Sequence, residues 1–520
     1  MAVSLSGMSL HTDNDNEGGW GGTDDPDDYN NAIQGTNSES WQVSKNSTET
    51  ATLTSSSALS TTRGIFTFWM SSNLAPYYTD VNLELQSSTN NYKTFEVANS
   101  TNKAIGGDFV ATAVDFVNKG TETGTFAEAS FSVLRIIVDN STSGNIRSVI
   151  NNWIDAMYYG VGHTISGTTT GDALFDEASA VDELTANKYG VMWNYNGVIY
   201  SQGDISLNGT ALTSSGETLV FVDTLNGYDT YNLDGTGTAT LKNTSIIAAG
   251  TIAVDFDTTS MTSFSMTGGA VSGDGITDIG SGQTLSGVVF TDRSITTIAN
   301  TAEGCTWNTS DTITVTGTLD DCIINENFST IATSVATLAK LTNNAFISDG
   351  AGHAVELTGA AGSYDWTCIS TGYDAGTSGD GVEVTGGSIT GDETIHITAT
   401  TGTFIINVGA TATLPSVSSA GAVVNVVSGA VTLKIVVKDQ SNAVVVGAYT
   451  YIDDNNIIPF ILNTTTDALG EASISHSDGA VAGSTWRVRK YGYKQFVQTV
   501  DIGGLDITLP VTLITDPQQT

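Results

Sequence analysis

The fold is decided near the middle of the chain by three short segments, Thr238-Ala239-Thr240-Leu241, Thr251-Ile252-Ala253-Val254 and Ser263-Phe264-Ser265-Met266. In each segment, larger apolar side chains alternate with Thr, Ser or Ala. Alternation of period two over a few residues predicts a short β-strand with one buried face. Similar segments recur through residues 201–430 between Gly, Asn and Asp turns, as in Thr394-Ile395-His396-Ile397. Stacked strands of this kind are typical of a β-solenoid, and we expect a right-handed parallel β-helix here.

A second arrangement also fits residues 201–430. The spacing of the short strands follows no strict consensus, so two further antiparallel sandwiches remain an alternative. Cys305 and Cys322 lie 17 residues apart, near the length of one solenoid coil, and could stack on neighbouring rungs. With Cys368 they make three cysteines, which fit no zinc-binding spacing. We interpret them as buried free thiols.

The composition indicates an all-β protein. The 520 residues include 56 Gly, 6 Pro and only 14% charged side chains. Thr and Val favour pleated backbone, whereas Gly and Asn favour turns. A formal net charge of −38 repels nucleic acid and anionic lipid, which argues against binding to nucleic acid or to a membrane. A hydrophobic content of 39% is nevertheless enough for packed cores, so the acidity is not of the disordered kind.

Residues 1–200 are the most aromatic part of the chain. They contain alternating segments such as Gly64-Ile65-Phe66-Thr67-Phe68-Trp69-Met70 and Ser132-Val133-Leu134-Arg135-Ile136-Ile137-Val138. Strands of this length, separated by Asn, Gly and Ser loops, predict an antiparallel sandwich of the jelly-roll or lectin-like type. Because this region is also the least repetitive, we expect it to be the part that docks onto an assembly.

One segment of this region departs from the β pattern. Between Ser143 and Tyr158, apolar residues fall at positions 146, 150, 153, 154 and 157, as on one face of a helix. Ser143 is a suitable N-cap and Gly160 a suitable stop. We therefore predict one helix near residues 144–158, covering an end of the sandwich.

The C-terminal region, residues 431–520, carries a recognisable series of short motifs. They are Asp439, Val446-Gly447-Ala448, Thr466-Asp467, Gly470-Glu471-Ala472 and Gly492-Tyr493. The series resembles the transthyretin-like and carboxypeptidase-regulatory-like modules, in which a "V.GA" hairpin precedes a "TD..G.A" turn and a terminal "GY". The resemblance implies a small Ig-like sandwich and says little about function.

The same region is locally basic within an acidic chain. Arg487, Arg489, Lys490 and Lys494 lie close together in the sequence. We interpret them as a solvated strand edge that prevents pairing with other sheets. A contact with an acidic neighbour is the alternative.

Acidic residues near the N-terminus are the only candidate metal ligands. Asp13, Asp15 and Glu17 precede Gly18 and could present three carboxylates to one structural Ca²⁺. The chain lacks the twelve-residue loop with a terminal bidentate Glu, so a solvated acidic loop is the alternative. We expect no other cofactor.

The sequence suggests sugar contact and no catalytic residue. Five histidines are scattered among Thr, Ser and Gly, and no G-x-S-x-G, H-E-x-x-H or Walker motif occurs. Tyr364, Asp365 and Trp366 are the best candidates for carbohydrate contact, because aromatic rings stack on sugars while carboxylates accept hydrogen bonds from hydroxyls. The alternative is a buried rung of the solenoid with Asp365 pointing outward.

The start of the chain suggests where the protein is made. Residues 1–7 have neither a basic nor an apolar signal segment, and no window approaches a membrane span, so we expect no secretory signal. A protein with an extracellular composition but no signal fits a phage particle, which is assembled in the host cytoplasm and released by lysis.

In its acidic, Gly-rich β composition and its predicted sandwich, solenoid and Ig-like module, the whole chain resembles appendage and decoration proteins of tailed bacteriophages. We expect a non-enzymatic structural virion protein, of the capsid decoration or tail fibre type. Its partners would be other virion proteins and a host surface glycan, and we favour a homotrimer. A tailspike polysaccharide depolymerase and a bacterial surface adhesin are the alternatives.

Overall fold

The computed structural model of the chain gives an all-β protein in two compact units, Met1–Asp311 and Thr312–Thr520. The structure describes residues 3–12, 20–21, 25–28, 38–44, 47–57, 63–72, 80–99, 110–127, 131–139, 150–179, 192–308, 312–326, 331–348, 353–371, 394–409, 412–428, 431–454, 457–476, 481–502 and 506–516. No helix within these ranges is both long and apolar enough to cross a membrane. The two units are described in turn.

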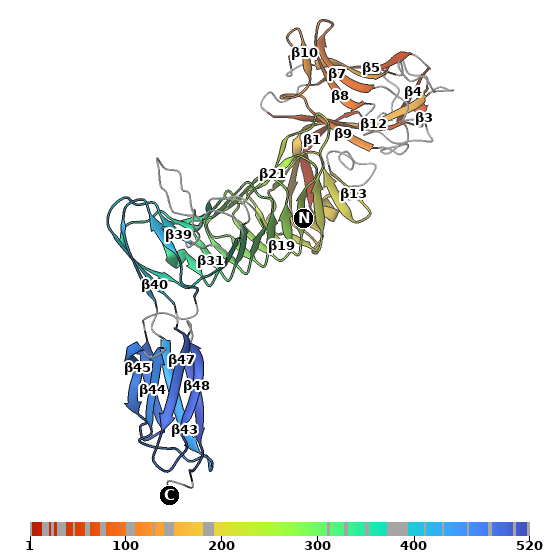
Figure 1. Ribbon diagram of the computed structural model, residues 1–520. Coiled ribbons are helices and arrows are strands. Elements are labelled where there is room, and N and C mark those ends of the chain that lie inside the picture. Colours follow the sequence, from red (N-terminus) through yellow and green to blue (C-terminus); the bar gives the residue numbers. More distant parts are fainter. Residues whose placement is uncertain are drawn as a thin grey trace. The chain divides into compact units, whose positions relative to one another are not determined.

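The first unit begins with a two-sheet sandwich (Figure 1). Its strands are β1 (Ser4–Thr12), β2 (Trp20–Gly21), β3 (Asp25–Asp28), β4 (Ser38–Val43), β5 (Thr48–Ser57), β6 (Ile65–Ser72), β7 (Asp80–Ser88), β8 (Asn91–Asn99), β9 (Val110–Asp115), β10 (Thr121–Thr123), β11 (Phe131–Asp139) and β12 (Ile150–Ser166). One sheet runs β10-β8-β7-β11-β5-β2 and is antiparallel. In the other, β12 pairs antiparallel with β1, β4 and β6, while β6 also pairs with β9. The predicted antiparallel region at the N-terminus is confirmed.

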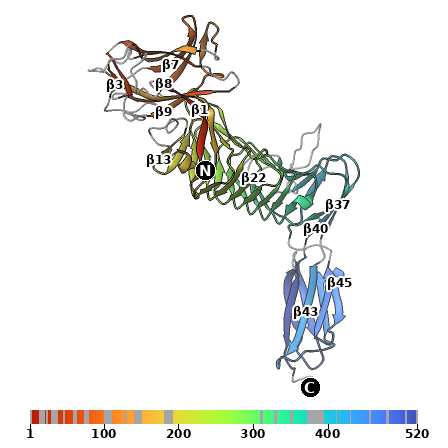
Figure 2. The same ribbon diagram turned by 180° about the vertical axis from the view of Figure 1, so that it is seen from behind.

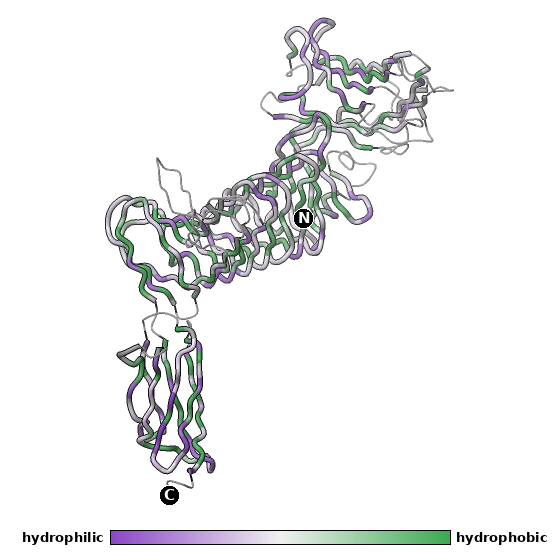
Figure 3. The backbone as a smooth tube through the Cα atoms, in the orientation of Figure 1, coloured by the Kyte–Doolittle hydropathy of each residue, from purple (hydrophilic) through white to green (hydrophobic). Residues whose placement is uncertain are grey.

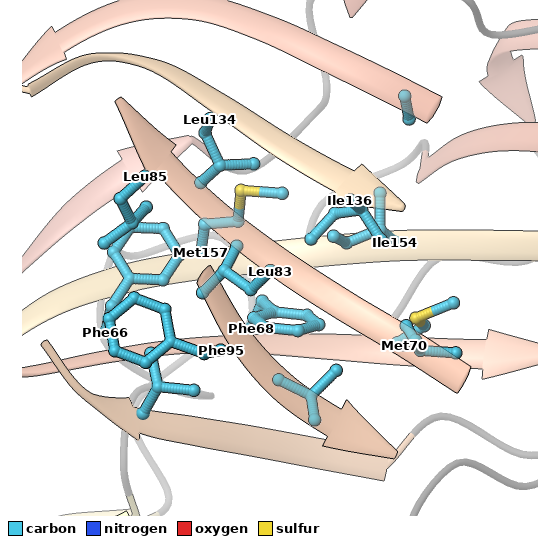
Figure 4. Packing of buried hydrophobic residues seen from close by; sticks show 14 of the residues in the cluster. Phe66, Phe68, Met70, Leu83, Leu85, Phe95, Leu134, Ile136, Ile154 and Met157 are labelled. Atoms are coloured by element: carbon cyan, nitrogen blue, oxygen red, sulfur yellow. The ribbon is translucent and has the colours of Figure 1, made fainter. Parts of the chain in front are cut away.

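Both sheets of the sandwich contribute to one hydrophobic core (Figure 4). Phe66, Phe68 and Met70 on β6 pack with Leu83 and Leu85 on β7, and all five are fully buried. Burial of an aromatic or aliphatic side chain contributes about 1.5–3 kcal/mol, so this core supplies most of the driving force for the sandwich.

The helix predicted near residues 144–158 is wrong, because residues 150–158 belong to the strand β12. Between Asp155 and Tyr158, β12 has a bulge with one residue more than β6, and Ala156 there has a φ of 47°. The bulge shifts the alternation by one residue, so Ile154 and Met157 both point into the core (Figure 4). A bulged strand therefore reproduces the three-residue spacing that is typical of a helix.

A parallel β-helix follows the sandwich in the first unit. Its strands are β13 (Met192–Tyr195), β14 (Val198–Ser201), β15 (Asp204–Leu207), β16 (Leu212–Ser215), β17 (Thr218–Phe221), β18 (Thr230–Asp234), β19 (Thr238–Lys242), β20 (Ser245–Ala248), β21 (Ala253–Asp257), β22 (Ser263–Thr267), β23 (Ala270–Ser272), β24 (Ile276–Ile279), β25 (Thr284–Ser286), β26 (Val289–Thr291), β27 (Ile295–Ile298), β28 (Thr301–Glu303) and β29 (Thr306–Asn308). Successive strands join three parallel ladders in rotation: β15-β18-β21-β24-β27, β16-β19-β22-β25-β28 and β14-β17-β20-β23-β26-β29. β13 forms an antiparallel hairpin with β14 ahead of these ladders, and the parallel pairing from β14 onward rules out the antiparallel alternative for residues 201–308.

Side chains alternate along these strands as the sequence predicts. In β19, Ala239 and Leu241 are buried while Thr238 and Thr240 are half-buried. The alternation is visible along the coils as successive hydrophobic and hydrophilic segments in Figure 3. A short helix, α1 (Leu174–Ser179), precedes the first coil and was not anticipated.

The second and third ladders are joined by a two-residue corner. Its first residue lies in the left-handed region, with φ values of 48° at Asn243, 64° at Gly287 and 60° at Gly304. Its second residue points inward and is buried, as at Cys305. Cys322 occupies the same corner of its own coil in the second unit, and Cys368 is buried as well. All three cysteines are free thiols, as predicted.

Arg63 joins the sandwich to the first coils. Its guanidinium donates to both carboxylate oxygens of Asp204, at 2.6 and 2.7 Å, and lies 3.9 Å from the centre of the Tyr228 ring. β12 makes a second connection, because its last residues pair in parallel with β15. The sandwich and the coils of this unit are therefore joined by a continuous sheet as well as by an ion pair.

The second unit opens with further parallel coils. Their elements are β30 (Thr312–Val315), β31 (Thr318–Asp320), β32 (Ile323–Glu326), β33 (Ile331–Val335), the 3-10 turn η3 (Leu338–Lys340), β34 (Leu341–Thr342), β35 (Ala345–Ser348), β36 (His353–Leu357), β37 (Gly362–Trp366), β38 (Ile369–Thr371), β39 (Ile395–Ile397), β40 (Thr403–Val408), β41 (Val417–Ser419) and β42 (Val423–Ser428). They form the ladders β30-β33-β36-β39-β41, β31-β34, β32-β35-β38 and β37-β40-β42. The same inward and outward alternation holds here.

The unit ends in a small two-sheet module, whose strands can be followed in Figures 1 and 2. Its strands are β43 (Val431–Asp439), β44 (Tyr449–Asp454), β45 (Ile457–Thr465), β46 (Glu471–His476), β47 (Val481–Arg489), β48 (Phe496–Ile502) and β49 (Ile507–Leu513). The sheets β46-β43-β49 and β45-β44-β47-β48 enclose a core around the fully buried Trp486. All pairs are antiparallel except β43 with β49. The predicted small C-terminal sandwich is confirmed.

Candidate functional site

A surface pocket lies on the C-terminal module, where β47 ends in a tight turn. The turn is closed by a hydrogen bond from the Tyr493 amide to the Lys490 carbonyl, 3.1 Å. Gly492 adopts a φ of 85°, which a residue with a Cβ rarely reaches. The Lys494 amide bonds the Ile514 carbonyl and the Asp516 amide bonds the Gly492 carbonyl, so the turn is fixed to the segment after β49.

This turn forms one side of a pocket of about 300 Å³. The pocket is lined by aromatic and charged side chains, namely Tyr449, Arg489, Lys490, Tyr491, Tyr493, Lys494, Gln495 and Asp516. Tyr491 is 84% exposed and Tyr449 61% exposed, values that are high for rings of this size. The site therefore offers three cations, one carboxylate and accessible aromatic faces, and we call it the basic pocket.

The strand register explains how Arg489 reaches the basic pocket. Tyr449 on β44 lies directly opposite Arg489 on β47, and Tyr451 lies opposite Arg487. Side chains of directly opposed residues share one face of a sheet. The guanidinium of Arg489 lies 5.3 Å from the centre of the Tyr451 ring, which restricts its orientation.

The three cations of the basic pocket differ in their partners. The Lys490 ammonium donates to the carbonyls of Val446 and Gly447, at 2.9 and 3.0 Å. Among the residues that the structure describes, neither the Arg489 guanidinium nor the Lys494 ammonium has a hydrogen bond or ion pair with another side chain. Arg487, which lies outside the pocket, is 3.8 Å from Asp453. Two cations are thus available to a ligand.

The sequence interpretation of these basic residues as a strand edge is wrong. β47 pairs with β44 on one side and β48 on the other, so it is an interior strand. Lys490 and Lys494 lie beyond its end, in and after the turn. The basic residues are recognisable from the sequence, whereas the contribution of Tyr449 and Tyr491 to the basic pocket depends on the fold. A signal was present in the clustering of cations around Gly492-Tyr493 in a chain of net charge −38.

The candidates for sugar contact do not act together. Trp366 is fully buried, stacks on Phe346 at 6.0 Å and donates its indole N–H to the Thr413 carbonyl. Tyr364 is half-buried and stacks on Phe404 at 5.9 Å. Asp365 points to the opposite face of β37 and is exposed. This is the buried-rung arrangement, and it leaves no surface that combines the ring of Trp366 with the Asp365 carboxylate.

The predicted calcium ligands Asp13, Asp15 and Glu17 lie outside the described residues. Within the described ranges, no group of three His, Cys, Asp or Glu side chains is arranged to hold a metal ion. The calcium site therefore stays a prediction.

Buried histidines are present but take no part in the basic pocket. His163 is buried, and burial lowers its pKa to about 4. The rings of His353 and His396 lie 5.4 Å apart, and burial, followed by the charge of His396, lowers the pKa of His353 to about 3. These side chains are neutral at pH 7. Burial also raises the pKa of the Cys368 thiol to about 11, which makes it a poor nucleophile.

Comparisons with known proteins add little. No protein-family model matches the chain, and no curated protein matches it. Among solved structures, the Bacillus anthracis TIE protein is 20% identical over 18% of this chain and 18% of that chain, with a TM-score of 0.15. TmCBM61 in complex with β-1,4-galactotriose is 12% identical over 30% of this chain and 86% of its own, with a TM-score of 0.16.

The catalytic domain of a GH87 α-1,3-glucanase in complex with nigerose is 9% identical over 82% of this chain and 98% of its own. Its TM-score is 0.16. The chain spans less than a fifth of the TIE protein. Likenesses at these scores do not bear on function, which has to be argued from the chain itself.

Proposed function

We propose that the protein is a non-enzymatic structural component of a tailed-phage virion, exposed on the particle as a decoration or tail fibre protein, and that its C-terminal module contacts the host surface. The observation that carries the proposal is the difference between the two kinds of surface. On β19 of the coils the outward residues Thr238 and Thr240 carry short hydroxyl side chains, whereas the C-terminal module presents a pocket with available cations and aromatic rings.

The coils suit a passive scaffold. Their strands pair in register with the coils before and after, as in β18 with β21 and β19 with β22. Continuous pairing leaves few backbone groups free, which favours rigidity and resistance to proteases. A net charge of −38 keeps such a protein soluble when many copies are crowded on one particle.

The proposal is tested on particles. Antibodies raised against the full chain are coupled to gold and applied to phage released by lysis from a culture whose genome encodes the chain. Gold at one structural position of the particle supports the proposal. Gold confined to the bacterial envelope contradicts it and favours the adhesin alternative.

Assembly is part of the proposal. We favour a homotrimer whose N-terminal sandwich attaches to the particle and whose C-terminal module projects. Light scattering on the purified chain measures its mass in solution, and the mass of three chains is the expected value. A monomer at all concentrations contradicts the trimer and favours a decoration protein that is ordered by the capsid lattice.

A further inference from the structure

We propose that the basic pocket binds an acidic saccharide, with Arg489 and Lys494 taking its carboxylate and the exposed tyrosines packing on its rings. The inference rests on the proposed function, because it names the class of host-surface molecule that the C-terminal module would contact.

The chain has a large excess of acidic residues. There are 55 Asp and Glu residues for 17 Lys and Arg, so most cations could find a carboxylate partner. Lys434 in the same module does so, at 2.6 Å from Glu471. Among the described residues, Arg489 and Lys494 have no such carboxylate partner, although Asp516 lines the same pocket. Cations left without carboxylates in so acidic a chain favour an external anion.

The geometry of Arg489 favours a carboxylate. A planar guanidinium offers parallel N–H donors that match the two oxygens of a carboxylate. The Tyr451 ring lies 5.3 Å from the guanidinium, and this cation–π contact favours its position. The Lys490 ammonium is bound to the carbonyls of Val446 and Gly447 and adds positive charge without moving.

The tyrosines favour a sugar over an acidic peptide. Tyr491 and Tyr449 expose most of their ring surface beside the cations. The C–H faces of a pyranose pack against flat aromatic faces, and its hydroxyls can bond the Gln495 amide or the Asp516 carboxylate at the pocket wall.

The test is isothermal titration of the full-length chain with tetragalacturonate at low salt. The methyl ester of the same oligosaccharide is the matched ligand, because it keeps the rings and removes the charge. We expect binding of the acid that weakens as salt rises, and at least tenfold weaker binding of the ester. Equal binding of both ligands, or no binding of the acid, overturns the inference.

Variants locate the binding. Arg489→Gln and Lys494→Gln should each weaken binding about tenfold or more, as loss of a charge-assisted hydrogen bond does. Tyr491→Ala should weaken it as well. Lys434→Gln is the matched control, since it removes a cation of the same module that is already paired, and it should bind as the parent does. Unchanged binding by Arg489→Gln and Lys494→Gln contradicts the assignment.

A hexaglutamate peptide separates sugar recognition from simple charge. Weaker binding of the peptide than of tetragalacturonate supports an acidic saccharide, and equal binding overturns the sugar assignment. Gold labelling of particles is independent of these titrations. Labelled particles without uronate binding would refute this inference alone, whereas uronate binding without labelled particles would refute the virion assignment alone.

Discussion

The coils of residues 201–308 and the C-terminal module differ in where they place an arginine side chain. One arginine is buried and the other is exposed. In the coils, Arg293 is fully buried, and its guanidinium donates to the Thr277 hydroxyl and to the carbonyls of Gly273, Asp274, Val254 and Ile276. In the module, Arg489 lines a pocket and bonds no acceptor among the described residues. A cation surrounded by backbone oxygens stabilises a fold, while a cation left at the surface is available for recognition.

Replacing Arg293 is expected to have the largest effect on the free energy of unfolding. Arg293→Met removes five hydrogen bonds of a buried guanidinium and should destabilise the first unit by more than about 3 kcal/mol. Urea denaturation followed by fluorescence measures this, because Trp307 is buried in a nearby coil and stacks on Phe290. Lys242→Met is the control, because Lys242 forms a half-exposed ion pair with Asp172 at the longer distance of 3.6 Å. Its loss should lower the free energy of unfolding by less than about 1 kcal/mol. Similar losses for the two variants would contradict the distinction.

The second effect concerns the buried histidines of the second unit. An unfolded histidine has a pKa near 6.5, whereas the pKa of His353 is about 3, so the unfolded state binds more protons between these values. Stability should therefore fall as the pH falls below 6.5, by about 2 kcal/mol down to pH 4.5. Denaturation at pH 7 and pH 4.5 measures the loss, and His353→Phe should reduce it. An identical pH dependence in the variant would show that His353 is not its source.

A smaller effect on stability is expected from substitutions at Gly304, in the corner between the second and third ladders. Gly304 has a φ of 60° with open space around it, so Gly304→Ala tests backbone strain alone and should cost about 1 kcal/mol. Gly304→Asn should cost less, because Asn243 occupies the same corner with a φ of 48°. Gly171→Ala, also in open space but without the left-handed backbone, should be neutral in the same thermal unfolding experiment. Equal effects of the two alanine variants would argue against corner strain.

Replacing Arg489 of the basic pocket should have the smallest effect on stability. Arg489→Gln is expected to change the free energy of unfolding by less than about 0.5 kcal/mol, since no buried acceptor loses its donor. Chemical denaturation of this variant beside Arg293→Met sharpens the comparison. A large loss of stability in Arg489→Gln would mean that Arg489 is a structural residue after all.

The coils could be predicted from sequence because their information is local. A strand such as Thr238–Lys242 shows its buried face through Ala239 and Leu241 alone, whatever its neighbours are. The segment around Ala156 could not be predicted, because its bulge depends on the pairing of β12 with β6, far away in the sequence. The three-residue spacing of Ile154 and Met157 then appeared helical.

The basic pocket could be predicted only in part for the same reason. Arg489, Lys490 and Lys494 stand together in the sequence, and their clustering was visible. Tyr449 and Asp516 join them only through the register of β44 with β47 and the bridge between Tyr493 and Thr515. The position of β47 within its sheet also depends on β48, so a strand that is interior was interpreted as an edge.

The central claim is that recognition resides in the C-terminal module and that the coils are a scaffold. Amide hydrogen exchange of the full-length chain, with and without saturating tetragalacturonate, tests it most directly. We predict slower exchange confined to residues 489–495 and 514–516, with no change in residues 201–308. Protection in the coils without protection of these two segments would contradict the claim.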